Sequence, residues 1–491
     1  MTRRKGSNAR GKMGELTLRM VDGTQIVVTA SLEAITTYVI LEQETWFEKE
    51  TAFLASWLKP GMSALDIGAN LGVYSLPMAR RLAPHGQVFA YEPASEPRRL
   101  LALGKAKNEA SNLHIIAAAL SDGEREGRLV LGASSELNSL QGSGPTESIQ
   151  ITSLDAEQRS RHWGPIDFVK MDAEGEEERI LAGAKGFFSE RSPLVMFEIK
   201  AGDKQNDRLP AAFASMGFDI YRLIGGAPVL VPVKLGEPLD PYELNLFAAK
   251  RDRARALAQE GFLIETIPSW EPDDTVRDWA LTQFEAQPFA HIFAALSGGA
   301  AAQDPVYRDA LAAYATWRSE ELALPRRYAA LKFACDTLGS LCQNQASLSR
   351  LSTLARIASD IGSRAIAVNA LRYVADVLKG GKGRILEPFW PASPRFDHLE
   401  PGTNPVGWFV VAALERLEQM ASFSSCFAPS LVDLDWLAGQ PLVGAEIERR
   451  RILQRARAGQ RVEVPPRLRV TAPDHVNDAI WRAGAVPNTR V

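Results

Sequence analysis

One stretch of sequence decides the fold of the first half of the chain: Ala64-Leu65-Asp66-Ile67-Gly68-Ala69-Asn70-Leu71-Gly72-Val73-Tyr74-Ser75. A short apolar strand leads into a glycine-containing turn, and a helix follows. Gly68 would let the backbone pass close to a ligand, and Gly72 would let the helix pack tightly on the strand. The helix start offers backbone N–H groups to a ligand. Asp66 lies at the carboxyl end of the strand, where ligands bind in open α/β sheets.

Further short apolar runs on either side of this stretch alternate with helical segments. With the first run, the expected strands are 64–67, 88–91, 113–116, 166–171, 194–199, 218–221 and 244–248. Several are apolar on both faces, as buried parallel strands are. This alternation predicts a Rossmann-like α/β domain with a mostly parallel, doubly wound sheet. Two additional strands are expected at 128–131 and 149–154, and 132–145 is expected to be a loop.

The segment before residue 64 is expected to hold a flexible tail, a hairpin and a helix. Residues 1–13 are polar and basic and are interpreted as the tail, which puts the start of the α/β domain at residue 14. Alternating residues around Asp22-Gly23 predict the hairpin. Apolar residues at helical spacing over 41–58 predict one helix, which Pro60-Gly61 ends.

Strand patterns nearly vanish after residue 250, so residues 251–491 are expected to form an all-α domain. Successive helices are predicted at 307–324, 327–341, 348–361, 363–378 and 406–420, with a Pro-rich break at 380–405. Pro325 is interpreted as the stop of the first of these helices. The hairpins suggest tetratricopeptide-like packing, although no period can be assigned.

The bulk composition excludes several classes of protein. The 491 residues are 46% apolar and 23% charged, as in a folded chain of two or three domains. A net charge of −3 argues against a nucleic-acid binder. No apolar run approaches the roughly 18 residues needed to cross a membrane, and no secretory signal is visible, so a cytoplasmic protein without a membrane span is expected. The three cysteines form no CxxC pair, so no zinc site is predicted.

Two details of the motifs indicate the ligand. The turn reads D-x-G-x-N-x-G rather than G-x-G-x-x-G, and the second strand ends in Tyr91-Glu92-Pro93. An acid at that strand tip can accept both ribose hydroxyls of an adenosine group, which alone would also suit NAD. Together the two elements resemble motifs I and II of a class I methyltransferase.

The resemblance extends over roughly residues 14–250 to the FkbM family of S-adenosylmethionine (SAM)-dependent O-methyltransferases. It is carried, in order, by Trp46-Phe47-Glu48, Leu58–Gly61, Asp66–Gly72, Tyr91–Pro93, Ala119–Gly123, Ile166–Gly175, Glu178, Leu181, Gly183, Pro193, Phe197-Glu198 and Asn245–Phe247. The second half of the chain finds no counterpart in the core family.

The resemblance implies a SAM pocket with assigned positions. Glu92 would hold the ribose, Ser121-Asp122 would lie by the adenine, and Glu48 would close over the pocket from the preceding helix. The methionine part of SAM would be lined by Asp66, Gly68, Asn70 and Gly72.

Residues after the strand 166–171 are the candidates for catalysis. Asp172 follows at the strand tip and is the first choice for binding the acceptor or removing its proton. Lys170, Glu174 and Glu198 are alternates, and a structural ion pair between Lys170 and Glu174 remains an alternative interpretation. Mg²⁺ bound by carboxylates is less favoured, because three ligands cannot be counted, and no metal ligand is assigned.

The favoured function is O-methylation of a hydroxyl on a sugar, glycan or secondary metabolite. Methyl transfer to nitrogen or a carboxylate is an alternative, and so is an inactive domain whose helical half acts as a scaffold. The helical half is expected to recognise the acceptor's body, a partner protein or a second copy of the chain. Eight arginines between 449 and 469 are interpreted as a solvated helix face, with an anionic partner as the alternative.

Overall fold

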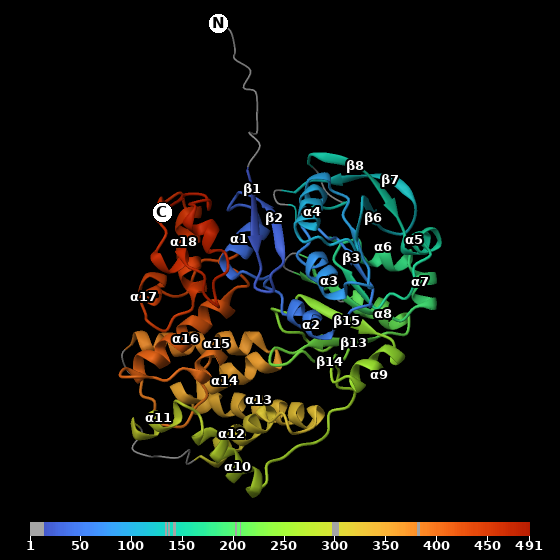
Figure 1. Cartoon of the computed structure of the whole chain (residues 1–491). Helices are drawn as coiled ribbons and strands as arrows, with labels where there is room; N and C mark the ends of the chain where they lie inside the picture. Colours follow the sequence, from blue (N-terminus) through green and yellow to red (C-terminus); the bar gives the residue numbers. More distant parts are fainter. Residues whose placement is uncertain are drawn as a thin grey trace.

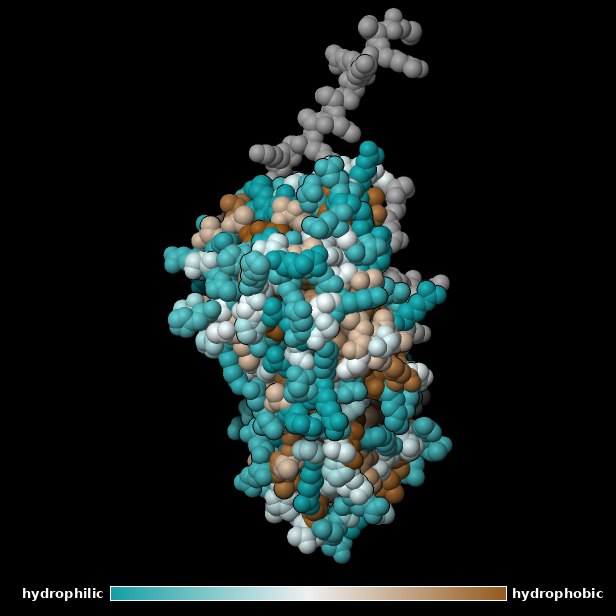
Figure 2. Space-filling view, turned by 90° about the vertical axis from the view of Figure 1, so that its right-hand side faces the viewer, coloured by the Kyte–Doolittle hydropathy of each residue, from teal (hydrophilic) through white to brown (hydrophobic). Residues whose placement is uncertain are grey.

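The computed structural model describes residues 14–132, 135, 138–140, 144–201, 204–206, 208–296, 304–380 and 383–491. An α/β part and a helical part lie side by side, and the last helices return to the start of the chain (Figure 1). Figure 2 shows that the face on the α/β side is mainly hydrophilic, with hydrophobic residues in small groups. No helix in the described ranges has the length and apolarity that a membrane span requires.

Eight strands form the central sheet, seven of them at the predicted apolar runs and one, β14, not predicted. Their order is β14 (Leu230–Pro232), β13 (Asp219–Leu223), β15 (Asn245–Ala249), β10 (Leu194–Glu198), β9 (Phe168–Met171), β3 (Ala64–Ile67), β4 (Val88–Tyr91) and β5 (Leu113–Ile116). β10, β9, β3, β4 and β5 are parallel, whereas β15 is antiparallel to both of its neighbours. The mostly parallel sheet is confirmed. Its strands bury apolar side chains on both faces under the surrounding helices.

Smaller sheets flank the central one. The expected hairpin is β1 (Glu15–Arg19) with β2 (Gln25–Thr29). A three-stranded sheet holds β6 (Ala118–Leu120), β8 (Thr146–Thr152) and β7 (Arg125–Val130). Two short pairs are β11 (Lys200–Ala201) with β12 (Lys204–Gln205), and β16 (Val462–Glu463) with β17 (Thr489–Arg490). Part of the expected loop 132–145 lies outside the described residues, as does the tail 1–13.

The helices of the α/β part cover the sheet. They are α1 (Ile35–Gln43), α2 (Glu50–Trp57), α3 (Ser75–Leu82), α4 (Ser95–Lys107), α5 (Leu154–Arg161), α6 (Glu177–Ala182), α7 (Lys185–Glu190), α8 (Arg208–Ser215) and α9 (Arg251–Gln259).

The single helix expected over 41–58 is wrong, because two helices meet at a break. Glu44 has a left-handed backbone with φ of 59°, which ends α1. Its carboxylate accepts hydrogen bonds from the backbone N–H groups of Val476 and Asn477, more than 400 residues away in the chain. This contact lies outside the local pattern, so helical spacing does not reveal it. The break turns Glu48 toward the edge of the sheet.

Successive helices build most of the second half, five of them at the predicted positions; the short pair β16 and β17 is an exception to the all-α prediction. The helices are α10 (Asp274–Glu285), α11 (Ala290–Leu296), α12 (Pro305–Arg318), α13 (Leu324–Asn344), α14 (Leu348–Ile361), α15 (Arg364–Lys379), α16 (Pro405–Ala421), α17 (Leu434–Ala438), α18 (Ala445–Arg457) and α19 (Asp478–Arg482), with 3₁₀ turns at Pro394–His398 and Pro466–Arg469. Pro325 does not stop a helix but occupies the first turn of α13, where a missing N–H costs nothing.

The solvated helix face expected for the terminal arginines is wrong for two of them. Arg449 and Arg450 are 2% and 1% exposed, on the side of α18 that packs against α1. Arg450 lies 3.4 Å from Glu42 and 2.9 Å from Glu446, and Arg449 lies 3.5 Å from Glu44. Buried charges of this kind need partners, and α1 supplies them. These ion pairs fix α18 to α1, the helix that precedes Glu48 in the chain.

Candidate functional site

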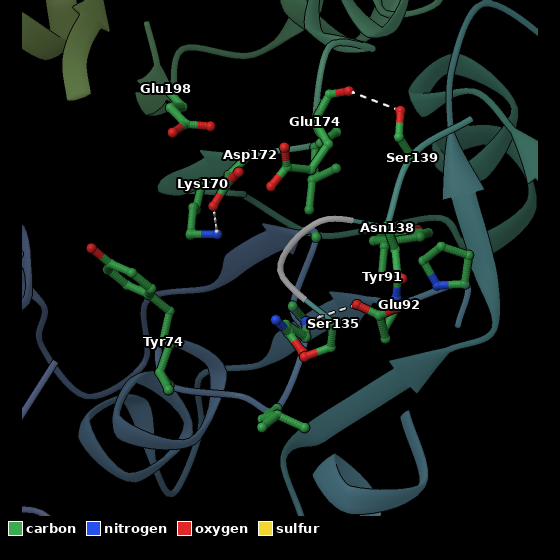
Figure 3. Close-up of a pocket in the computed structure, with 18 of the residues that line it drawn as sticks. Tyr74, Tyr91, Glu92, Ser135, Asn138, Ser139, Lys170, Asp172, Glu174 and Glu198 are labelled. Carbon is green, nitrogen blue, oxygen red and sulfur yellow. Dashed lines mark hydrogen bonds and ion pairs between the residues drawn. The ribbon is translucent and has the colours of Figure 1, made fainter. Parts of the chain in front are cut away.

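A cavity of about 560 Å³ opens at the carboxyl ends of β3, β4, β9 and β10; we call it the first cavity. Parallel strands bring their carboxyl ends to one edge, so residues far apart in the chain meet there. In Figure 3, Lys170, Asp172 and Glu198 lie on one side of this space and Glu92 lies away from them. Eight of the twelve predicted site residues line it: Glu48, Gly68, Asn70, Glu92, Lys170, Asp172, Glu174 and Glu198.

Gly68 is required by a close approach within the protein, and it also lines the first cavity, so its contact with a ligand stays a prediction. Its φ is 79°, and a Cβ there would lie 1.9 Å from the carbonyl oxygen of Asp172. The glycine therefore lets the turn after β3 touch the tip of β9. Gly72 lies outside the cavity wall, and a Cβ there would lie 2.4 Å from the Leu101 side chain of α4.

Glu92 is anchored at the end of β4 with both carboxylate oxygens engaged. They accept hydrogen bonds of 2.8 Å from the backbone N–H groups of Asn70 and Ala94. The side chain is 6% exposed, and burial raises the pKa of Glu92 to about 7. Each oxygen keeps a lone pair for a donor in the cavity. The neighbouring Asn70 Oδ1 is buried without a hydrogen-bond partner among the described residues.

Lys170 links the carboxylates at the floor of the cavity. Its Nζ lies 3.0 Å from Asp172 Oδ2 and 3.6 Å from Asp66 Oδ1. Burial opposes its charged form, but Asp172 and Asp66 outweigh this and raise the pKa of Lys170 above its usual range. Asp66 is fully buried behind the wall and accepts a hydrogen bond from Ser75. Lys170 is thus paired with two aspartates rather than held in the alternative ion pair with Glu174.

Two further glutamates enclose the space above Asp172. Glu48 accepts hydrogen bonds from Trp46 at 2.9 Å, Tyr74 at 2.5 Å and Asn245 at 3.0 Å. Burial raises the pKa of Glu48. Burial, followed by the charges of Asp172 and Glu174, raises the pKa of Glu198 to about 10, so Glu198 is protonated at neutral pH.

Ser121 and Asp122 lie outside the wall of the first cavity. Ser121 donates a hydrogen bond of 2.8 Å to Glu176, and Asp122 pairs with Arg125 and Arg179 at the surface. The cavity wall beside Glu92 is instead formed by Tyr91 and residues 118–120.

Aromatic side chains of the C-terminal half complete the first cavity, which the sequence analysis missed. Phe423 and Phe427, just after α16, line it together with Trp46 and Phe47. The ring of Phe47 lies 5.4 Å from that of Phe423 and 5.7 Å from that of Phe427. No local signal marks these phenylalanines, because their role depends on the packing of the two halves.

The described part of the chain contains no group of three or more His, Cys, Asp or Glu side chains arranged to hold a metal ion. Three carboxylates of the first cavity have partners within the protein: Asp172 is bound by Lys170, Glu48 by Tyr74, and Glu92 by two backbone N–H groups.

Comparison with known proteins gives a family match within the α/β part. Residues 66–220 match the model of the methyltransferase FkbM domain. A 69-residue stretch is 41% identical to the AMB antimetabolite synthetase AmbE of Pseudomonas aeruginosa, covering 14% of this chain and 3% of that protein's length.

Solved structures with a similar part include the methyltransferase FkbM from Methylobacillus flagellatus KT, with 16% identity, a TM-score of 0.27, and coverage of 38% of this chain and 43% of that chain. A SAM-dependent O-methyltransferase from Thermotoga maritima has 16% identity and a TM-score of 0.27. The match covers 48% of this chain and 77% of that chain. The helical half is not covered by the family model. Residues 66–220 therefore form a methyltransferase domain of the FkbM type.

Proposed function

We propose that this chain is a SAM-dependent O-methyltransferase that acts on a hydroxyl of a sugar, glycan or secondary metabolite. The observation that carries the proposal is that Glu92 and Asp172 face one cavity from the ends of β4 and β9, on either side of the glycine turn after β3. Such an arrangement suits a nucleoside cofactor on one side and an acceptor on the other.

The residues around Glu92 fit the adenosine part of SAM. The anchored carboxylate can accept the ribose hydroxyls, and the unpartnered Asn70 Oδ1 can accept a further donor. Tyr91 and residues 118–120 offer an apolar wall for the base. When bound, SAM supplies an electrophilic methyl group on a sulfonium.

Asp172 is the proposed base for the acceptor hydroxyl. Its side chain is 33% exposed, so it reaches the space where an acceptor would lie. It would accept the proton of the acceptor hydroxyl, while Lys170 holds the Asp172 carboxylate in place. Protonated Glu198 can donate a hydrogen bond to a second acceptor oxygen. The faces of Phe47, Phe423 and Phe427 would pack against a sugar ring or an aromatic metabolite.

Calorimetric titration with S-adenosylhomocysteine (SAH) tests the cofactor assignment. Glu92→Gln should weaken SAH binding roughly tenfold to hundredfold, because hydrogen bonds to a charged group contribute about 1.5–3 kcal/mol. Glu96→Gln on α4 is the matched control, since Glu96 pairs with Arg99 at the surface. A folded wild-type protein that does not bind SAH would refute the proposal and favour the scaffold alternative.

Methyl transfer from labelled SAM then identifies the acceptor atom. Incorporation into an ether supports O-methylation, whereas incorporation into an amine or an ester would favour the nitrogen or carboxylate alternative. Removing residues after 255 is not a suitable control, because Phe423 and Phe427 complete the cavity. The same wall supports the proposal that the helical half recognises the acceptor rather than a separate partner.

A further inference from the structure

A second cavity of about 220 Å³ adjoins the first. The two share Phe47, Glu48, Leu244 and Phe423 as lining residues. One side of the second cavity comes from the α/β part, and the other comes from α15, α16 and the end of α14. It therefore lies at the junction of the two halves of the chain, next to the proposed acceptor position.

Two arginines from the helical half line the second cavity. The Arg416 Nε is buried and has no hydrogen-bond partner, and its guanidinium forms no ion pair among the described residues. Arg364 donates a hydrogen bond of 2.8 Å to the carbonyl oxygen of Met420 and stacks 4.4 Å from the ring of Phe423. Within the described ranges, no carboxylate lies at ion-pair distance from Arg364.

The acidic residues of this cavity offset the arginines only in part: burial lowers the pKa of Arg364 and outweighs the charge of Asp240, which favours charged Arg364. Glu243 pairs with Lys49 at 2.7 Å, and Asp240 accepts hydrogen bonds from two backbone N–H groups. Burial raises the pKa of Glu50 to about 8, so it is largely uncharged at neutral pH. Glu48 is bound by Tyr74, and burial raises its pKa as well.

Carboxylates farther from the cavity that influence Arg416 are bound to other arginines. Asp360 lies 3.8 Å from Arg356, Glu415 lies 2.8 Å from Arg395, and Glu446 lies 2.9 Å from Arg450. Positive charge is therefore left in the second cavity. The Arg416 Nε is buried without a partner among the described residues, while the side chain as a whole is half-buried at the cavity. A charge that is partly removed from water without an opposite charge is costly, and an anionic ligand would compensate it.

We propose that the second cavity binds an anionic group of the acceptor, a phosphate or a carboxylate, through Arg416 and Arg364. The planar guanidinium matches both groups with paired hydrogen bonds. A volume of about 220 Å³ suits such a group rather than a second large molecule. The inference rests on the proposed function, since it places the acceptor's hydroxyl in the first cavity and its anionic group in the second.

The test uses the full chain and inorganic phosphate as the first probe. Thermal unfolding and calorimetry are measured for the wild type, Arg416→Met, Arg364→Gln and the control Arg455→Met, whose guanidinium pairs with Asp435 at the surface. Phosphate should bind the wild type and the control alike, and at least tenfold more weakly to Arg416→Met and Arg364→Gln. Without phosphate, Arg416→Met should unfold at the same or a higher temperature than the wild type, because it loses a half-buried charge that no ion pair in the described part of the chain compensates.

Equal phosphate binding by the wild type and Arg416→Met would overturn the proposal. A lower unfolding temperature of Arg416→Met with unchanged phosphate binding would assign the arginine a structural role and also overturn it. SAH binding to Arg416→Met should equal that of the wild type. Weaker SAH binding would mean that Arg416 holds the cofactor's carboxylate, whereas absence of SAH binding in every protein would refute the proposed function separately.

A second experiment distinguishes an anionic group that belongs to the acceptor from a free anion such as inorganic phosphate. Sugar phosphates and hydroxy acids are titrated beside their neutral counterparts and inorganic phosphate, with SAH present. At least one anionic member should bind tenfold more tightly than phosphate and lose this advantage in Arg416→Met. If inorganic phosphate binds as tightly as every member of the panel, the cavity serves a free anion and the acceptor assignment is wrong.

Discussion

Replacing Glu92 with glutamine should stabilise the protein without cofactor in alkaline solution while it weakens SAH binding. Burial raises the pKa of Glu92 from 4.5 to about 7. The carboxyl therefore loses its proton at a lower pH in the unfolded chain than in the folded protein. The wild type loses stability from this group as the pH rises through this interval, from 4.5 to about 7. Glutamine has no proton to lose, so the variant escapes this loss.

The size of the effect follows from the two pKa values. A tenfold difference in proton affinity corresponds to about 1.4 kcal/mol, so this carboxyl costs the wild type about 2 kcal/mol more at about pH 8.5 than at about pH 5.5. Glutamine's single oxygen can accept from only one of the Asn70 and Ala94 N–H groups, which costs about 1–3 kcal/mol at every pH. In total the carboxylate costs the wild type about 1.4 kcal/mol at about pH 5.5 and about 3.4 kcal/mol at about pH 8.5. The variant should thus be about as stable as the wild type, or less stable, at about pH 5.5 and more stable than the wild type at about pH 8.5.

Urea unfolding at the two pH values, followed by tryptophan fluorescence, measures this change. The surface variant Glu96→Gln provides the baseline, because its carboxylate pairs with Arg99 in solvent. A difference in unfolding free energy between the wild type and Glu92→Gln that stays the same at both pH values would refute the reasoning. The result would then mean that water or a neighbouring group keeps the buried carboxyl at an ordinary pKa.

Gly68→Ala should lower stability by roughly 3 kcal/mol and abolish SAH binding, because its Cβ would lie 1.9 Å from the Asp172 carbonyl oxygen; a stable variant in calorimetry would contradict this. Asp172→Asn should slow methyl transfer by about a hundredfold or more with SAH affinity unchanged, and an active variant would exclude Asp172 as the base. Arg450→Met should lower the unfolding free energy by about 3–5 kcal/mol, because it leaves the buried carboxylates of Glu42 and Glu418 without this ion-pair partner. An unfolding free energy in urea equal to that of the wild type would show that these ion pairs contribute little to stability. Phe423→Ala should raise the KM for the acceptor while the KM for SAM stays constant, because the ring lines the proposed acceptor side of the first cavity. Equal changes in both KM values would show that Phe423 does not contact the acceptor selectively.

The strands and turns of the α/β part depend on local patterns, which is why they could be predicted. The runs 64–67, 88–91 and 113–116 coincide with β3, β4 and β5. Apolar runs and glycine turns act over a few residues, and the edge at which parallel strands end follows from them. Eight predicted residues consequently meet in one cavity, although they lie up to 150 residues apart in the chain.

The sequence by itself determined the sheet, the glycine turn and the acidic residues at the strand ends, because short-range patterns encode them. Only the tertiary structure decided that Glu44 breaks a helix, that Arg450 is buried and that Phe423 closes the first cavity. Each of these depends on contact between the two halves of the chain. The sequence does not show whether a charged or aromatic side chain lies in water or in such a junction. That depends on contact partners hundreds of residues away in the chain.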